Sequence, residues 1–222
     1  MDLKQRTEIF INVHKGLRRG LWGLALRIGE LDWGDGGEVN SAGREFENVL
    51  LFLREHAANE NDIQFPFLEE RVPGATQKER EEHRDLDFRL DLLEKHWYQL
   101  LREQEREEAG YRFYLEYNQF LSSYLDHMDR EERELTEAFY RHCSDHEIDE
   151  AFKKIVARTS PQDMSVMLTY MIPAMNPSDR IQFMSKAKAS ASPDAFDRVK
   201  SLAEKVLEPG GWRKLSALLG EK

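Results

Sequence analysis

Residues 113–139 read FYLEYNQFLSSYLDHMDREERELTEAF, and their apolar positions return every three or four residues. That spacing places a single apolar stripe along an α-helix. The stripe consists of Phe113, Tyr117, Phe120, Leu121, Tyr124, Met128, Leu135 and Phe139. The stretch therefore predicts a long amphipathic helix that buries one face.

Three earlier stretches of the chain carry a stripe of the same kind. We predict long helices at residues 5–31, 41–62, 76–106 and 110–145. Breaks rich in glycine and proline separate the first three of them, at residues 34–37 and 73–74. Four amphipathic helices of similar length with short connections favour an all-α protein built on an antiparallel four-helix bundle.

The chain changes character after about residue 147. Ser160, Asn176 and Ser192 each precede a proline, which is the pattern of a capping side chain followed by proline at the first helical position. We predict four or five short helices here. The expected organisation is a bundle at residues 1–146 and a C-terminal extension of short helices, residues 147–222, packed on it. The frequent methionines of the extension indicate core packing, with a surface for a partner protein as the alternative.

The composition excludes several classes of protein. The 222 residues carry a net charge of -10, which argues against a nucleic-acid partner. Mean hydropathy is -0.70, and no apolar run reaches the roughly 20 residues that span a bilayer. The only cysteine is Cys143, so an internal disulfide is excluded, and the first residues lack a secretory signal pattern. We expect a cytoplasmic protein with no membrane partner.

Histidine and glutamate lie on all four apolar stripes. These residues are His14 in the first helix, His56 and Glu60 in the second, His83 in the third, and His127 and Glu131 in the fourth. Each His–Glu pair is four residues apart, so both side chains point the same way from adjacent turns. We therefore expect the six side chains to meet inside the bundle.

Two buried glutamates need compensating charge. An ionised carboxylate in an apolar core is costly unless it is paired or binds a metal ion. No lysine or arginine shares the apolar face with Glu60 or Glu131, and neutral imidazoles supply no positive charge. A single histidine on an apolar face is more often an ordinary core residue. The joint occurrence on four stripes nevertheless favours two metal ions that the glutamates could bridge.

The three other histidines are expected away from this site. His96 lies about 220° round its helix from His83, so it belongs to another face. His142 and His146 flank Cys143 in a spacing that superficially resembles half of a zinc site. We expect this second pair on the surface.

The motifs together resemble the hemerythrin-like, or HHE cation-binding, family. The resemblance covers roughly residues 5–145 and is carried by His14, HAANE at 56–60, EEHRDLD around His83 and HMDREE from His127. It implies a non-heme centre of two iron ions bridged by Glu60 and Glu131, with His14, His56, His83 and His127 as the histidine ligands. Manganese or zinc would also suit imidazole and carboxylate ligands.

One position departs from the oxygen-carrying members of that family. They have a second histidine four residues after the first in the third helix, where this chain has Asp87. The change argues against reversible oxygen carriage, although not against oxygen reactivity. Asp87 could be a weak ligand, a partner of His83 or a solvated residue. We expect it to hold the ring of His83, because a ligating histidine usually has its second nitrogen bonded to an acceptor.

Three classes of function remain open. The first is a protein that binds or senses O2, a related small molecule, or iron or redox state. The sequence favours it because it shows no phosphate-binding loop and no pairing of a nucleophile with a base that would indicate catalysis. The alternative is an oxidoreductase acting on peroxide, nitric oxide or Fe(II), in which Tyr117 and Tyr124 could take part, although core packing is the commoner role of such tyrosines. The third is a structural or interaction module.

Overall fold

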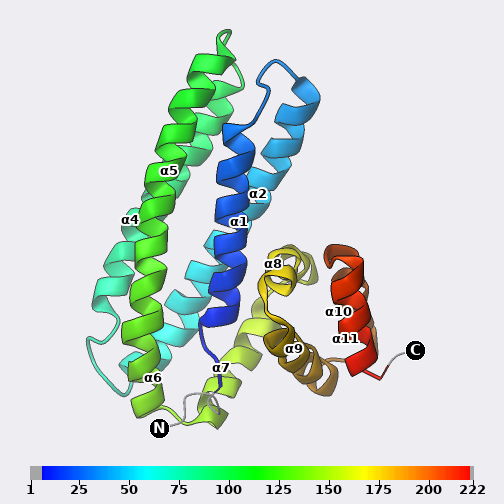
Figure 1. Ribbon diagram of the computed structural model, residues 1–222. Helices are drawn as coiled ribbons and strands as arrows, with labels where there is room; N and C mark the ends of the chain where they lie inside the picture. Colours follow the sequence, from blue (N-terminus) through cyan, green and yellow to red (C-terminus); the bar gives the residue numbers. More distant parts are fainter. Residues whose placement is uncertain (1–6, 221–222) are drawn as a thin grey trace.

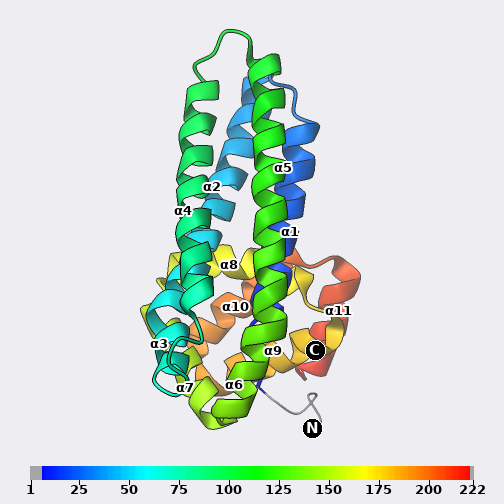
Figure 2. The same cartoon turned by 90° about the vertical axis from the view of Figure 1, so that its left-hand side faces the viewer.

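The computed structural model describes residues 7–220, and every regular element in that range is a helix. The long helices are α1 (Ile11–Gly29), α2 (Gly36–Asn59), α4 (Gln77–Leu100) and α5 (Arg106–Arg130). They lie side by side in Figures 1 and 2. The prediction of an all-α protein is confirmed. Residues 1–6 and 221–222, which begin and end the two predicted domains, lie outside the described range.

Some predicted helix boundaries are wrong. Helix α2 begins at Gly36 instead of residue 41, because the Asp35 carboxylate accepts the backbone N–H groups of Gly37 and Glu38 at 2.7 and 3.1 Å and caps the helix there. Helix α4 ends at Leu100 and α5 begins at Arg106, so the break between them comes earlier than predicted. The polar stretch 102–105 has no side chain to bury in the core, so packing cannot stabilise another turn.

A π-helical turn follows two of the long helices. Helix α2 passes through η2 (Glu60–Gln64) into α3 (Phe65–Glu69), and α5 passes through η3 (Glu131–Leu135) into α6 (Thr136–His142). The backbone N–H of Phe65 donates to the carbonyl of Glu60, and that of Thr136 donates to the carbonyl of Glu131. Each bond spans five residues, which defines a π-helical turn. The two glutamates of the apolar stripes therefore each stand where the helix widens, and such turns are frequent at functional sites.

Two apolar clusters fill the space among these helices. The larger contains Leu17, Leu24, Phe46, Trp97 and Tyr117, among other buried residues. The smaller lies at the end of the helices near α3 and α6 and contains Phe10, Phe65, Leu135 and Phe139. In the segments of α1, of α2 with η2 and of α5 with η3, the histidines and glutamates of the stripes come between residues of the two clusters. A polar layer is therefore enclosed by apolar packing on both sides.

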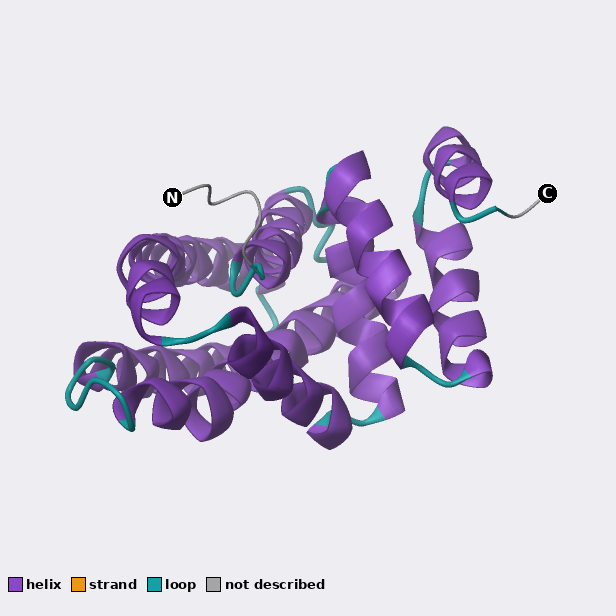
Figure 3. Ribbon diagram, turned by 90° about the horizontal axis from the view of Figure 1, so that it is seen from below, coloured by secondary structure: helices purple, strands orange, loops and turns teal. Residues whose placement is uncertain are grey.

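Five shorter helices complete the described chain. They are α7 (Asp145–Arg158), α8 (Pro161–Ala174), α9 (Pro177–Ser190), α10 (Pro193–Val206) and α11 (Pro209–Leu218). The side chains of Ser160, Asn176 and Ser192 cap α8, α9 and α10 as the sequence predicts. Figure 3 shows these helices joined by short loops beside the long ones.

Helix α8 lies directly against α1. A Cβ atom on Gly16 would come within 2.7 Å of Met171 Cγ, and one on Gly20 within 3.3 Å of Tyr170. The glycines thus allow the two backbones to approach closely. Met167, Met175 and Met184 are buried, which supports core packing as the role of the methionines in this region. Within residues 7–220, no helix combines the length and the apolar character that a membrane span requires.

Candidate metal centre

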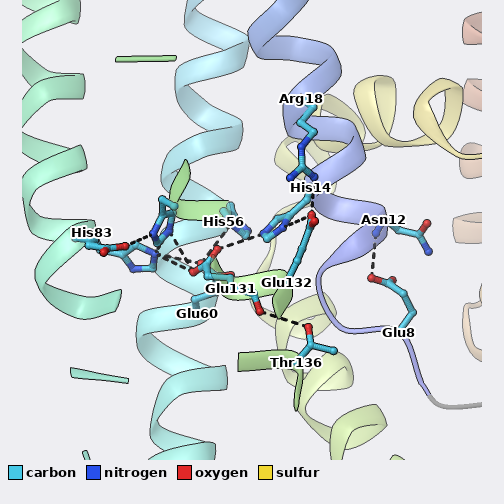
Figure 4. Close-up of polar contacts among 12 residues, drawn as sticks. Glu8, Asn12, His14, Arg18, His56, Glu60, His83, Glu131, Glu132 and Thr136 are labelled. Atoms are coloured by element: carbon cyan, nitrogen blue, oxygen red, sulfur yellow. Dashed lines mark hydrogen bonds and ion pairs between the residues drawn. The ribbon is translucent and has the colours of Figure 1, made fainter. Parts of the chain in front are cut away.

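The six predicted site residues gather in one buried layer. Their exposed fractions are 0% for His14, 3% for His56, 1% for Glu60, 2% for His83, 1% for His127 and 0% for Glu131. Helix α1 contributes one histidine, α4 another, and α2 with η2 and α5 with η3 each contribute a His–Glu pair. Figure 4 shows the side chains of His14, His56 and His83 pointing toward the two glutamates.

The layer divides into two groups that share the glutamates. One group is His14 and His56 with Glu60 and Glu131, and the other is His83 and His127 with the same two glutamates. Within each group, one nitrogen or oxygen atom from every residue lies within 4.8 Å of the others. The arrangement thus offers two neighbouring positions, each with two imidazoles and two shared carboxylates.

The polar atoms of this layer lack ordinary partners. Among the described residues, both carboxylate oxygens of Glu60 and of Glu131 are buried without a hydrogen bond, and so are the Nε2 atoms of His14 and His56. No lysine or arginine side chain forms an ion pair with either glutamate in the part of the chain that the structure describes. Buried carboxylates without hydrogen bonds are costly, so the layer requires a cation or bound protons.

The distances fit metal ions of the expected size. His83 Nε2 lies 3.0 Å from His127 Nε2, and the closest ring nitrogens lie 3.2 to 3.5 Å from the glutamate oxygens. Two ligand atoms that are each about 2.1 Å from one ion, at bond angles near 90–109°, are about 3.0–3.4 Å apart. The residues present therefore suit transition-metal ions with little rearrangement.

A carboxylate fixes the orientation of His14. Its Nδ1 lies 2.9 Å from Glu132, the residue that follows Glu131 in η3, and Glu132 also accepts from Arg18. With the proton on Nδ1, the lone pair of Nε2 faces the glutamates. Burial opposes ionisation of Glu132, but His14 and Arg18 outweigh burial and lower its pKa to about 2. This carboxylate thus remains charged across the physiological range.

The rings of His127 and His83 are held in the same way. His127 Nδ1 lies 3.0 Å from Glu82, which also pairs with Arg130 at 2.6 Å. His83 Nδ1 lies 3.1 Å from the side-chain oxygen of Asn61. An acceptor on Nδ1 orients a histidine whose Nε2 is a metal ligand and raises its basicity.

The expectation for Asp87 is wrong. Its side chain is exposed, and both ring nitrogens of His83 have other neighbours, Asn61 on one side and His127 with the glutamates on the other. The position of Asn61, immediately after the opening glutamate of η2, brings its amide to the Nδ1 side of the ring. Asp87, one turn further along α4, lies on the exposed surface instead.

The electrostatics of the layer favour bound protons when no ion compensates the carboxylates. Burial and the negative charge of Glu131 raise the pKa of Glu60. Burial lowers the pKa of His83, but its contacts with Glu131 and Glu60 outweigh burial and raise it to about 10. Burial also opposes the charged form of His127, yet its contact with Glu131 raises its pKa. The raised pKa values of Glu60, His83 and His127 thus favour bound protons in the region where cations could bind.

Aromatic rings enclose the layer. Phe10 stacks on His14 and Phe65 on His83, with ring centroids 5.5 and 5.2 Å apart. Two surface cavities still reach it. One of 680 Å³ has His83 and Asn61 in its wall, and another of 390 Å³ between α4 and α5 has His127 in its wall. The two cavities thus adjoin the cluster at histidines that are themselves only 2% and 1% exposed.

The other histidines lie outside the layer. His142 and His146 are exposed, as predicted. His96 lies on another face of α4 and pairs with Glu116 at 2.7 Å.

Three residues that the sequence analysis missed, Asn61, Glu82 and Glu132, hold ring nitrogens of the cluster. Each of the three is next in sequence to a predicted site residue. This adjacency is the sequence feature by which they could have been predicted.

Comparison with known families agrees with the geometry. A family model described as the hemerythrin HHE cation binding domain matches residues 6–139, which is more than half of the chain and includes the whole cluster. Comparisons with curated proteins and with solved structures gave no match.

Proposed function

The chain belongs to the hemerythrin HHE cation-binding family, and from this we propose that its buried cluster holds two metal ions, with iron as the metal. The proposed ligands are His14, His56, Glu60, His83, His127 and Glu131. The observation that carries the proposal is the set of four buried carboxylate oxygens without a hydrogen bond, flanked by ring nitrogens on four helices. Imidazole and carboxylate together suit iron, with manganese or zinc as possible substitutes.

The proposed architecture follows the family. We propose that α1, α2, α4 and α5 form its antiparallel four-helix bundle within residues 1–146, and that residues 147–222 are an extension packed on the bundle. The close approach of α8 to α1 and the ion pair of Lys15 with Asp179 at 2.5 Å support this division. The family match ends at residue 139, before the extension begins.

The proposed activity is the binding or sensing of O2, a related small molecule, or iron or redox state. A bound iron pair would supply redox chemistry for such a ligand, and the six residues named above would hold it. The chain itself orients the imidazoles, through Glu132, Glu82 and Asn61, and excludes bulk water with apolar layers on both sides. The limited access favours a ligand of a few atoms.

Metal loading tests the proposal. Protein purified without added metal is analysed for metals, and metal-free protein is titrated anaerobically with Fe(II) before exposure to air. We expect two irons per chain and a near-ultraviolet and visible absorption band after oxidation. Protein that stays colourless and takes up no iron contradicts the proposal. Steady-state turnover of peroxide or nitric oxide above that of free iron would instead assign the chain to the oxidoreductases.

A further inference from the structure

Tyr124 has a buried hydroxyl group that no part of the described chain satisfies. The residue is 4% exposed, and its hydroxyl oxygen is buried without a hydrogen-bond partner. It lies on α5 three residues before His127, which is about 5 Å along the helix on nearly the same face. The phenol therefore lies beside the polar layer, on the side of the larger apolar cluster.

Tyr117, two turns earlier on the same helix, shows that this core can satisfy a tyrosine. It is 1% exposed, and its hydroxyl donates to the backbone carbonyl of Leu21 at 3.0 Å. The two tyrosines share a helix and a buried face but differ in this one bond. A buried polar group without a hydrogen-bond partner is destabilising. An acceptor from outside the described chain would therefore stabilise the hydroxyl of Tyr124.

The surroundings of Tyr124 indicate where that acceptor belongs. Its ring packs against the ring of His127 with centroids 5.8 Å apart, and against Phe120 at 5.7 Å. Burial, together with the charges of Glu60 and Glu131, raises the pKa of the Tyr124 phenol, so it keeps its proton, and neither carboxylate forms a hydrogen bond with it. The ring of Tyr124 thus packs on His127 of the cluster, and its hydroxyl has no acceptor in the described chain.

We propose that Tyr124 donates a hydrogen bond to a small ligand of two or three atoms, with an oxygen or nitrogen acceptor, that binds at the His83 and His127 half of the cluster. The inference rests on the proposed metal site, because the ligand needs an ion to hold it. Phe120, which also packs on the ring, has no polar group, and the Tyr124 hydroxyl is a buried donor without a partner in the described chain. Tyr124 is a ligand-binding residue in this account and not a metal ligand.

Azide is a suitable probe, since it is triatomic, anionic and accepts hydrogen bonds through nitrogen. Iron-loaded wild-type protein, Tyr124→Phe and the matched control Tyr117→Phe are titrated with azide, and binding is followed by its absorption change. We expect Tyr124→Phe to bind azide about 10-fold more weakly, as the loss of one hydrogen bond to a charged acceptor predicts. Tyr117→Phe should bind azide as tightly as wild type.

A second measurement does not depend on the variant. The infrared antisymmetric stretch of bound azide in wild-type protein should shift between H2O and D2O, because the donated proton exchanges. Equal azide affinity in Tyr124→Phe at equal iron content, or no solvent-isotope shift, overturns the assignment. A phenolate-to-iron absorption band that disappears in Tyr124→Phe also overturns it, because the residue would then be a metal ligand. Failure of wild type to bind iron rejects the proposed function itself, and the iron content measured beforehand separates the two cases.

Discussion

The Nδ1 atom of His14 on α1 lies 2.9 Å from the carboxylate of Glu132 on η3. The same relationship recurs across the cluster, where the amide oxygen of Asn61 on η2 lies 3.1 Å from Nδ1 of His83 on α4. In both cases the residue after a buried glutamate holds a histidine of another helix. Each widened turn therefore supplies both a carboxylate to the interior and a support to a neighbouring ring.

Glu132→Gln should weaken metal binding without removing a proposed ligand. The neutral amide supports the His14 ring less strongly and leaves Arg18 without its carboxylate partner. Loss of such a support typically costs about 10–100-fold in metal affinity. Competition with a chromophoric chelator measures the change. Glu134→Gln, an exposed position in the same turn, is the matched control and should bind metal as wild type does. Equal affinities in the two variants would show that the His14 ring needs no carboxylate.

Glu60→Gln should have opposite effects on the loaded and the metal-free protein. It removes a carboxylate shared by both halves of the cluster, so metal content and the Tm of the loaded protein should fall. In metal-free protein the same change removes a buried acid without a hydrogen bond, so the Tm should stay the same or rise. Thermal melts with and without iron, beside metal analysis, test both halves of the prediction. The exposed Glu107→Gln is the control, and full metal content in Glu60→Gln would contradict the ligand assignment.

Asn61 and Asp87 form a second matched pair. Asn61→Ala removes the acceptor on Nδ1 of His83, so we expect metal affinity to fall by about 10-fold or more. Asp87→Asn should leave both affinity and metal content unchanged, because its side chain is exposed and forms no hydrogen bond with His83 in the described structure. Isothermal titration of both variants gives the comparison. A larger effect at Asp87 would restore the role that the sequence suggested for it.

The sequence predicted the buried cluster because helical periodicity is a local property. His56 and Glu60 had to share a face whatever the other helices did, since they are four residues apart on one apolar stripe. The residues that hold the histidine rings, Asn61, Glu82 and Glu132, could not be predicted in this way. Whether Asn61 or Asp87 reaches the His83 ring depends on the distance and rotation between two helices, and the extra residue of a π turn changes that rotation.

The packing of α8 on α1 left a weaker signal in the sequence. Gly16 and Gly20 are four residues apart on one side of α1, but two glycines in a helix do not say which segment packs over them. The partner, Met171 with Tyr170, lies about 150 residues away in the chain and is fixed only by the tertiary fold. Long-range pairings of this kind are beyond periodicity arguments.

Metal binding should release protons. His83 has a pKa raised to about 10, so it holds a proton near neutral pH when no ion is bound, and the raised pKa of Glu60 acts in the same direction. A metal ion requires the neutral imidazole and the carboxylate, so binding displaces these protons and affinity should increase as pH rises from 6 toward 9. Calorimetry in two buffers of different ionisation enthalpy measures the protons released. Heats that do not depend on the buffer would contradict the protonation assigned to the cluster.

The stability of the metal-free protein should decrease as pH rises, whereas its affinity for metal should increase. The folded-state pKa of His83 lies above its unfolded value near 6.5, so the stabilisation from its protonated form is fully present below that value. It is lost as pH rises through about 10. Urea midpoints of metal-free protein should therefore decrease between pH 7 and pH 10, and His83→Gln should flatten this part of the profile. A midpoint that rises over the same range would contradict the assignment.

Gly16→Ala should destabilise the protein although alanine favours helix. The new Cβ would lie 2.7 Å from Cγ and 3.0 Å from Cα of Met171, so a rotamer change alone cannot relieve the contact and α8 must move. Overpacking of this kind costs about 1–3 kcal/mol, which exceeds the helix-propensity gain of about 1 kcal/mol. Gly23→Ala on the same helix meets only the Glu45 carboxylate at 3.7 Å, so the propensity gain should appear there as increased stability. Urea unfolding of the two variants gives the comparison. Equal stabilisation in both would mean that α8 does not pack on α1 at Gly16, and the proposed seating of the C-terminal extension would be wrong.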